Sequence, residues 1–192
     1  EKNRIKIEAG DIQGVNHGLA SLLQLIMTAK DAQLPVLTIQ DKPAFGYRGL
    51  MLDCARHFWT VDELKETLDH MAFFKLNTLH MHLTDNQAWR LSMDKYPDLV
   101  KEGTYYYDFP ELSGKYYSKE DLKEIVTYAG TRGIEIIPEV DLPGHSIALL
   151  AALPELSCRG GKFEATPEER DWNKRKRGNE NMICIGNPQS FA

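Results

Sequence analysis

From residue 46 onward, short apolar runs alternate with longer amphipathic segments. Residues 50–52, 78–83 and 134–137 are apolar runs of the length expected for buried strands. Between these runs, apolar residues recur at the three- and four-residue spacing of helices that bury one face. This alternation predicts parallel βα units, in which helices cover the sheet.

The helices have recognisable starts and ends. Thr60 is followed three residues later by Glu63, which is the spacing of a capping box. Ser118 precedes a second helical run, which Gly133 is expected to end. A third helix is predicted over residues 146–153.

The first 42 residues have a different pattern. Residues 4–9 alternate polar and apolar side chains, as a half-buried strand does, and residues 36–39 predict another short strand. Between them lie a turn-rich segment and a helical run that begins near residue 19. We therefore expect residues 1–42 to be the end of a small α+β domain.

The expected fold class is α/β. Residues 43–192 hold about three βα units, and a (β/α)8 (TIM) barrel needs about 250 residues. We therefore interpret residues 43–192 as the N-terminal part of such a barrel, truncated after about its first three units.

Charge and composition narrow the classes of partner. The net charge is -5, with 42% hydrophobic and 27% charged residues, which argues against a nucleic-acid partner. The basic run 174–177 is read as a solvated loop, with an anion contact as the alternative. No apolar run is long enough to span a membrane.

The three cysteines are Cys54, Cys158 and Cys184, and they form no Cys-x-x-Cys unit. Cys54 follows an apolar strand and is expected to be a buried thiol. Cys158 and Cys184 bracket a glycine- and charge-rich stretch, so a disulfide there is compatible with the sequence but not established by it. Such a bridge would stabilise the fold by about 3 kcal/mol and would indicate a periplasmic or extracellular protein.

Polar side chains lie in or beside three predicted strands. Arg48 comes with the first strand, Asp85 follows the second, and Glu139 and His145 come with the third. Ligand sites of parallel α/β folds lie at the carboxyl ends of strands, so these residues predict one binding pocket. The alternatives are a structural ion pair for Arg48, a loop cap for Asp85 and a hydrogen-bonded loop histidine for His145.

A metal site is a rival interpretation. His80 and His82 are two residues apart on a predicted strand and so share a face, and His145 or Asp85 could complete a ligand set. That arrangement would suit a metal-dependent hydrolase. No glycine-rich phosphate-binding motif follows any strand, so we expect no nucleotide cofactor.

Three motifs resemble one family. Residues 45–58, 77–90 and 138–145 are similar to the first, second and third barrel-strand signatures of the family 20 glycoside hydrolases, the β-N-acetylhexosaminidases. Residues 1–42 resemble the end of the accessory α/β domain that precedes that barrel. Met81 and Asn86 depart from the family pattern, which often has an aromatic residue and an acid there.

The resemblance implies an exo-acting hydrolase of terminal β-linked GlcNAc or GalNAc that uses no metal or other cofactor. It also implies substrate-assisted catalysis, in which the acetamido group of the substrate is the nucleophile. By this likeness Arg48 would hold ring hydroxyls 3 and 4. Asp85 would line the site and pair with His145, which would bridge to a catalytic carboxylate on the next strand. Apart from the likeness, we expect Glu139 to support the site, and the alternative for Glu139 and Asp141 is a hydrogen-bonding role on the inner wall.

The same resemblance places an adjacent Asp-Glu pair, including the general acid, after two glycines on a fourth strand. No Gly-Gly-Asp-Glu occurs in the 192 residues, where Gly160-Gly161 precedes Lys162. We therefore expect the chain to carry part of a site, to need the rest of the barrel as its partner, and to be inactive alone. A non-catalytic sugar-binding fragment is the remaining alternative.

Overall fold

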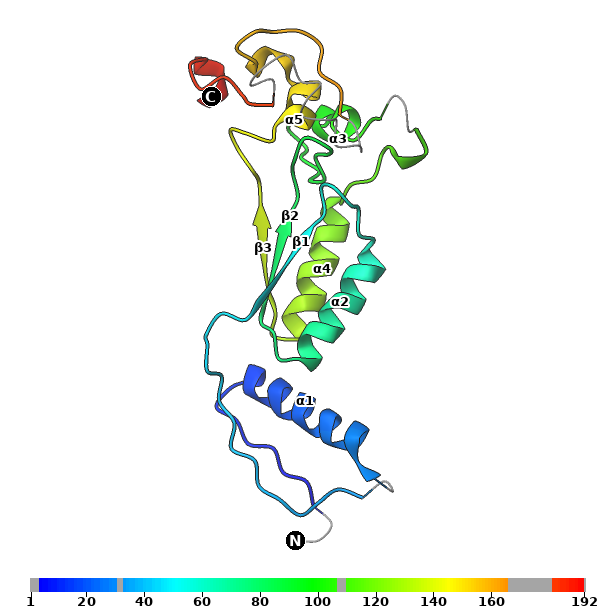
Figure 1. Cartoon of the computed structure of the whole chain (residues 1–192), viewed down its shortest axis with the longest axis vertical. Coiled ribbons are helices and arrows are strands. Elements are labelled where there is room, and N and C mark those ends of the chain that lie inside the picture. The colour runs from blue at the N-terminus through cyan, green and yellow to red at the C-terminus, as the bar shows by residue number, and fades with distance from the viewer. Residues whose placement is uncertain (1–3, 31–32, 107–109, 166–180, 192) are drawn as a thin grey trace, which may run out of the picture. The chain divides into compact units, whose positions relative to one another are not determined.

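A computed structural model describes residues 4–30, 33–106, 110–165 and 181–191. It contains a three-stranded sheet in the order β1 (Gly49–Asp53), β2 (Thr78–His82) and β3 (Glu135–Glu139) (Figure 1). The strands are parallel, since hydrogen bonds join neighbours at both ends in the same order. Asn77 N donates to Arg48 O before the strands, and Cys54 N donates to His82 O after them. The predicted strands are confirmed to within two residues at each end.

Helices α2 (Val61–Phe73) and α4 (Lys119–Thr131) make the crossovers between the strands. The capping box predicted at the start of α2 is confirmed, with Thr60 and Glu63 bonding each other's backbone. Ser118 exchanges hydrogen bonds with Asp121 at the start of α4. Gly133 follows the end of α4 with a φ of 68°, a conformation that glycine adopts without strain.

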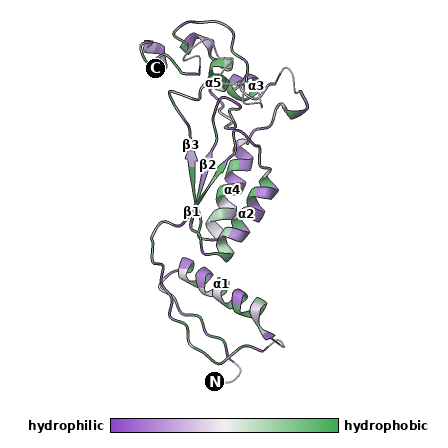
Figure 2. Cartoon of the chain, in the orientation of Figure 1, coloured by the Kyte–Doolittle hydropathy of each residue, from purple (hydrophilic) through white to green (hydrophobic). Residues whose placement is uncertain are grey.

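The described residues belong to two compact units, which we describe separately. The first comprises Glu1–Leu50, Thr60–His80 and Glu124–Ile137. Helices α2 and α4 bury one apolar face, and Figure 2 shows hydrophilic and hydrophobic residues along both helices. The fully or almost fully buried side chains of this unit include Leu64, Leu68, Met71, Leu79, Ile125 and Ala129.

The second unit comprises Met51–Trp59, Met81–Lys123 and Pro138–Ala192. It contains the carboxyl ends of all three strands together with α3 (Asp98–Glu102) and α5 (Ile147–Ala152). These two helices pack on a core that includes Trp89, Leu99, Tyr106, Leu149 and Leu150.

Gly103 allows α3 and α5 to approach closely. A Cβ atom at this position would lie 2.3 Å from Leu99 O and 2.9 Å from Ala148 O, which is too close for any other residue. The backbone φ of Gly103 is one that any residue can adopt. Close packing, and not backbone conformation, is therefore the reason that a glycine is needed here.

The N-terminal segment differs from its prediction. Helix α1 spans Ile12–Thr28, so it begins inside the segment predicted to be a turn, and the Asp11 side chain caps it by accepting from Gly14 N. Residues 4–9 and 36–39 are not strands. An alternating pattern yields a strand only when a neighbouring strand supplies ladder hydrogen bonds, and no described strand pairs with either segment.

Other predictions have mixed outcomes. Cys158 and Cys184 form a disulfide, and Cys54 is a buried free thiol, whose pKa burial raises to about 11. The basic run 174–177 lies outside the described residues. None of the described helices has the length and apolar character needed to cross a bilayer. The domain boundary at residue 42 stays a prediction.

Candidate active site

The carboxylate of Asp85 lies just after β2 and is buried, with 1% of its side chain exposed. Its Oδ1 accepts hydrogen bonds from His145 Nδ1 at 3.0 Å and from Asn86 N at 2.6 Å. Its Oδ2 lies 3.0 Å from His82 Nε2 and 2.7 Å from Arg56 Nη2. These four donors fill the lone-pair positions of a carboxylate.

Arg56 reaches Asp85 from the turn that follows β1. Asp53, the last residue of β1, forms this turn by accepting from Ala55 N at 3.1 Å and Arg56 N at 3.0 Å. The other Asp53 oxygen lies 2.6 Å from Arg56 Nη1. Burial by itself raises the pKa of Asp53, but the hydrogen bonds from Arg56 outweigh it and lower the pKa. The guanidinium is thus held between two carboxylates.

His82, the last residue of β2, bonds a carboxylate through each ring nitrogen. Nε2 lies 3.0 Å from Asp85 Oδ2, and Nδ1 lies 3.1 Å from Glu139 Oε1 at the end of β3. Because carboxylates only accept hydrogen bonds, this pair of contacts favours the protonated ring, in which both nitrogens carry hydrogen. Burial lowers the pKa of His82, but the bonds to Asp85 and Glu139 outweigh it and raise the pKa.

His145 lies in the loop between β3 and α5. Its backbone has a φ of 53°, which is uncommon for a residue other than glycine. The loop is tied to its surroundings because Ile147 N donates to Asn86 Oδ1 at 3.3 Å and Ser146 N donates to Asn181 O at 2.8 Å. The His145 side chain is 42% exposed and uses Nδ1 for Asp85, so Nε2 is its second hydrogen-bonding atom.

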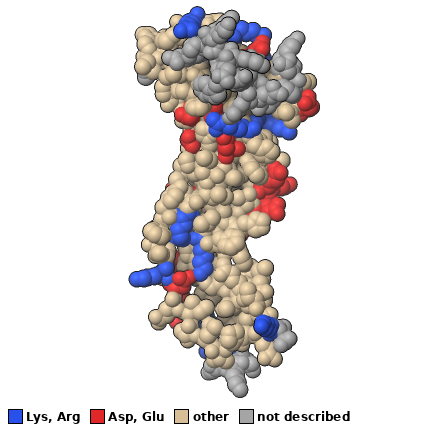
Figure 3. Space-filling view, viewed as in Figure 1, with Lys and Arg blue, Asp and Glu red and all other residues tan. Residues whose placement is uncertain are grey.

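The carboxyl ends of three adjacent strands thus deliver one connected set of polar groups. We call it the Asp85 cluster; it consists of Asp53, Arg56, His82, Asp85, Glu139 and His145. A buried carboxylate lies at its centre, and Arg56, Glu139 and His145 are each more than 30% exposed at its edge. Such an edge can donate to and accept from the hydroxyl groups of a sugar. Figure 3 shows acidic and basic side chains side by side near these strand ends.

A sequence model described as "Glycosyl hydrolase family 20, catalytic domain" matches residues 45–192, which is most of the chain. The chain belongs to glycosyl hydrolase family 20. The resemblance seen in the three strand motifs is therefore confirmed.

Curated members of family 20 align with most of the chain. The chain is 40% identical over 174 residues to a "Beta-hexosaminidase" of Porphyromonas gingivalis, covering 85% of the chain and 22% of that protein. It is 43% identical over 159 residues to a "Beta-hexosaminidase" of Akkermansia muciniphila, covering 79% of the chain and 32% of that protein. The chain thus spans about a fifth to a third of the length of these relatives.

Solved structures of family 20 proteins share the fold. One described as "crystal structure of a beta-N-acetylhexosaminidase" has a TM-score of 0.81 and 37% identity, covering 93% of this chain and 38% of its own. The Streptomyces plicatus N-acetyl-beta-hexosaminidase in complex with Thio-NAglucal has a TM-score of 0.78 and 34% identity, covering 93% and 36%.

Not every residue predicted for the family 20 site lies in the Asp85 cluster. Asp85, His145 and Glu139 do, and the expected pairing of Asp85 with His145 is present as a hydrogen bond. Arg48 does not. Its Nε donates to Lys75 O at 2.8 Å and its Nη1 donates to Phe45 O at 2.7 Å. Arg48 precedes β1, whereas ligand sites of parallel sheets lie where strands end.

Arg56 is the residue that sequence reasoning missed. Two arginines flank β1, and the prediction chose the one before the strand. The direction of the strand carried the missing signal, because only a residue after Asp53 emerges at the carboxyl end. The Asp53-x-x-Arg56 spacing, which allows a turn with an ion pair, was the second signal.

The metal-dependent alternative used His80 and His82. Among the described residues, two groups of potential ligands lie close together, namely His82, Glu139 and Asp141, and Asp85, Asp141 and His145. His80 belongs to neither. Both nitrogens of His82 already bond carboxylates, and both oxygens of Asp85 already accept from donors. Hydrogen bonding therefore accounts for the close approach of His82 to Glu139 and of His145 to Asp85.

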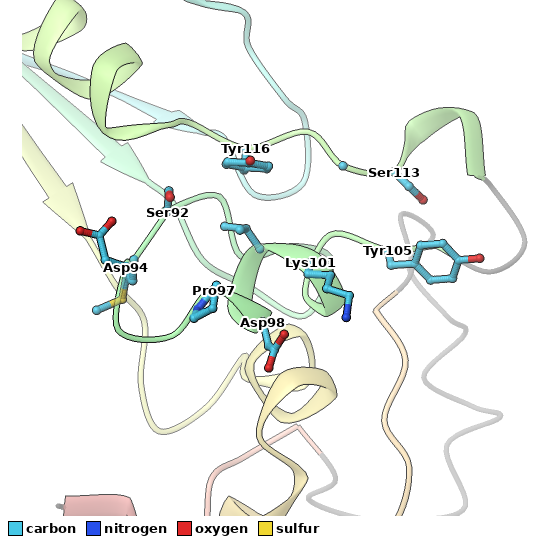
Figure 4. Close-up of a pocket in the computed structure, with 11 residues that line it drawn as sticks. Ser92, Asp94, Pro97, Asp98, Lys101, Tyr105, Ser113 and Tyr116 are labelled. Atoms are coloured by element: carbon cyan, nitrogen blue, oxygen red, sulfur yellow. The ribbon is translucent and has the colours of Figure 1, made fainter.

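A separate hollow of about 660 Å³ lies in the second unit, beside α3 (Figure 4). Its walls come from the end of the segment before α3, from α3 itself and from the segment after it, and they include Asp94, Asp98, Lys101, Tyr105 and Tyr116. None of the Asp85 cluster lines it, so the family 20 site prediction does not extend to it.

Proposed function

We propose that the chain forms part of the active site of an exo-acting β-N-acetylhexosaminidase, which releases terminal β-linked GlcNAc or GalNAc from glycans. The observation that carries the proposal is the buried Asp85 carboxylate, shared by Arg56, His82 and His145 where three adjacent strands end. Relatives named as beta-hexosaminidases at 40% identity or more support the same assignment.

The proposed reaction is substrate-assisted and retains the anomeric configuration. The acetamido oxygen of the substrate attacks the anomeric carbon while the bond from that carbon to the leaving oxygen breaks. A protein acid protonates the leaving oxygen. Water then opens the cyclic cation at the same carbon, and the second inversion restores the configuration. An attached nucleophile has a high effective concentration, so no enzyme nucleophile is needed.

We assign to Arg56 the role that the family resemblance had suggested for Arg48. Its guanidinium is anchored to Asp53 and Asp85 on one side and is partly exposed on the other. A planar fork held in this way is preorganised to bind a pair of ring hydroxyls. Glu139, which is 34% exposed and bonds His82, supports the same edge.

Asp85 and His145 would control a proton donor. Asp85 holds Nδ1 of His145 and thereby fixes the ring orientation and tautomer. Nε2 could then bond a catalytic carboxylate and adjust its pKa. The family resemblance puts that acid in an Asp-Glu pair that is not present among these 192 residues. The chain thus supplies the supporting part of the site, and the acid must come from elsewhere in the protein.

We also infer that the sheet continues into a (β/α)8 barrel. β2 lies between two strands and is buried, whereas β1 and β3 are the edges of the described sheet and expose apolar residues such as Met51 and Ile137. Further strands on those edges would cover this surface.

The compartment is a separate proposal. The Cys158–Cys184 disulfide is the kind of bridge that persists in oxidising surroundings, so we place the protein in a periplasm or outside the cell. Fractionation followed by mapping of the Cys158 and Cys184 peptides without reduction tests this. A reduced pair in a cytosolic fraction would contradict it.

The deciding experiment uses the full-length protein that carries this chain. We expect hydrolysis of a chromogenic aryl β-GlcNAc and no comparable hydrolysis of the matching aryl β-glucoside, because the glucoside lacks the acetamido nucleophile. Activity should survive removal of metal ions by a chelator. Equal turnover of both glycosides, or activity that requires added zinc, would refute the substrate-assisted assignment.

A further inference from the structure

Arg90 is a buried cation with an unusual set of partners. Only 4% of the residue is exposed, and among the described residues no carboxylate forms an ion pair with it. Its guanidinium donates to main-chain carbonyl groups instead, namely Cys54 O and Ala55 O at 3.0 Å each and Lys115 O at 2.6 Å. The Phe58 ring packs against it, with the guanidinium carbon 5.4 Å from the ring centre.

Burying a cation without a counter-charge is unfavourable, so these contacts must offset a desolvation cost. Burial also lowers the pKa of the guanidinium, although arginine remains protonated in proteins. An uncharged side chain could fill the same space without that cost. The guanidinium therefore needs an explanation beyond filling the core.

The two carbonyl groups held by Nε and Nη2 belong to the turn between Asp53 and Arg56. Cys54 and Ala55 are the only residues between them, so the Arg90 fork fixes the peptide groups from which Arg56 departs. The main chain of Arg90 is itself fixed, because its N–H donates to Leu83 O at 2.9 Å, next to the end of β2. Arg90 thus joins the β1 turn to the strand that carries the Asp85 loop.

We propose that Arg90 is a positioning residue for the Asp85 cluster, holding the Cys54–Ala55 turn so that Arg56 meets Asp85. The effect of Arg90 on catalysis rests on the proposed hexosaminidase function. The effect of Arg90 on the Arg56–Asp85 contact does not rest on that function, so the proposal about Arg90 and the proposed function can fail separately. The competing explanation is a role in fold stability alone.

A double-mutant cycle on the full-length protein separates these explanations. Arg90→Lys keeps the charge but loses the fork that spans two carbonyl groups. We expect kcat/KM on an aryl β-GlcNAc to fall about 10- to 100-fold, since small misplacement of a binding group has effects of this size. In a protein that already carries Arg56→Ala, adding Arg90→Lys should lower kcat/KM by less than about a further 2-fold. If the fall in kcat/KM of the double variant equals the product of the falls in the two single variants, the two residues act independently and the proposal is overturned.

Arg132→Lys is the matched control. Arg132 also donates to a main-chain carbonyl group, Tyr128 O at 3.2 Å, and stacks on the Tyr128 ring, but it belongs to the first unit. It should alter the thermal midpoint without changing kcat/KM. A fall in kcat/KM equal to that of Arg90→Lys would mean that loss of any such arginine impairs the enzyme, and would also overturn the proposal.

A readout without turnover is the NMR titration of the His82 ring, which bonds the same Asp85 oxygen as Arg56. Loss of the guanidinium leaves that oxygen more available to the imidazolium. Arg56→Ala should therefore shift the titration to higher pH, Arg90→Lys should shift it the same way, and the double variant should equal Arg56→Ala. An unshifted titration in Arg90→Lys overturns the proposal, even if the wild-type protein hydrolyses no hexosaminide.

Folding of each variant is checked by its thermal midpoint. If Arg90→Lys does not fold, Phe58→Leu takes its place in the cycle, because it removes the ring behind the guanidinium and leaves the hydrogen-bonding groups. The expected loss in kcat/KM is then about 3-fold, again absent in the Arg56→Ala background. A folded Phe58→Leu variant with unchanged kcat/KM and an unshifted His82 titration would count against the proposal.

Discussion

Asp85 Oδ1 and His145 Nδ1 lie 3.0 Å apart, although the two residues are 60 positions apart in the chain. Asp85 follows β2, and His145 follows β3, which is the neighbouring strand. The contact therefore depends on the parallel register of the two strands. It links a buried carboxylate to a ring that is 42% exposed.

The first prediction concerns Asp85. Asp85→Asn places an amide where four donors converge, so the NH2 group of the asparagine faces another donor. Arg56 and His82 also lose the negative charge that they share. We expect kcat/KM on an aryl β-GlcNAc to fall about 100-fold or more. Asp94→Asn, at an exposed acid paired with Lys119, is the control and should retain wild-type kcat/KM. Near-normal turnover by Asp85→Asn would remove the central residue of the proposed site.

The second prediction distinguishes the two arginines that flank β1. Arg56→Lys should lower kcat/KM at least about 10-fold, mainly through KM, because an ammonium group cannot replace a two-pronged contact to hydroxyl groups. Arg48→Lys should instead lower the free energy of unfolding by about 1 kcal/mol, since it loses bonds to Lys75 O and Phe45 O. Steady-state kinetics and denaturant titration of both variants check this. The reverse outcome would restore Arg48 to the site.

The third prediction concerns pH. The pKa of His82 is raised in the folded protein, so its contribution to stability is complete at pH values below the unfolded pKa of about 6.5 and is lost as the pH rises through the folded pKa. A neutral ring has one N–H and cannot donate to both Asp85 and Glu139. The difference in thermal midpoint between wild type and His82→Gln should therefore shrink as pH rises from 5 to 9. If the difference in thermal midpoint grows as the pH rises, the protonated His82 ring does not stabilise the fold and the prediction is wrong.

The fourth prediction concerns the disulfide, which joins residues separated by 26 positions. Replacing both Cys158 and Cys184 with serine should lower the free energy of unfolding by about 3 kcal/mol, because the open chain has more conformations when unfolded. Denaturant titration under non-reducing conditions measures this. The free energy of unfolding of the wild type under reducing conditions should match that of the double variant. If the double variant is less stable but the wild type is unaffected by reductant, the loss comes from altered packing and not from the missing bridge.

Local signals in the sequence predicted most of the elements. The Thr60–Glu63 capping box and the apolar runs at residues 50–52, 78–83 and 134–137 depend on neighbours in sequence, so each could be recognised by itself. Asp85 and His145 could be paired because parallel strands bring their carboxyl ends to one edge. The strands predicted in the N-terminal segment are absent because strand formation does not depend on neighbours in sequence alone. A strand at residues 4–9 needs a partner strand, and the local pattern does not reveal whether one is present.

The choice between Arg48 and Arg56 shows another limit. Both are single arginines beside the same apolar run, and composition does not distinguish them. Their difference is positional, because five strand residues at about 3.3 Å each separate the two ends of β1. Arg90 was equally hidden, since its partners are carbonyl groups, which every residue has and no sequence pattern marks.

Gly103 has a bearing on how this enzyme family can vary. Since any Cβ at position 103 would collide with the main chain of α5, the segment that contains Gly103 and the loop that carries His145 cannot change independently during evolution. Grafting the 87–114 loop from a relative to change substrate preference should therefore succeed only when the donor loop brings a glycine to this crossing point. A single residue outside the Asp85 cluster would decide which chimaeras fold.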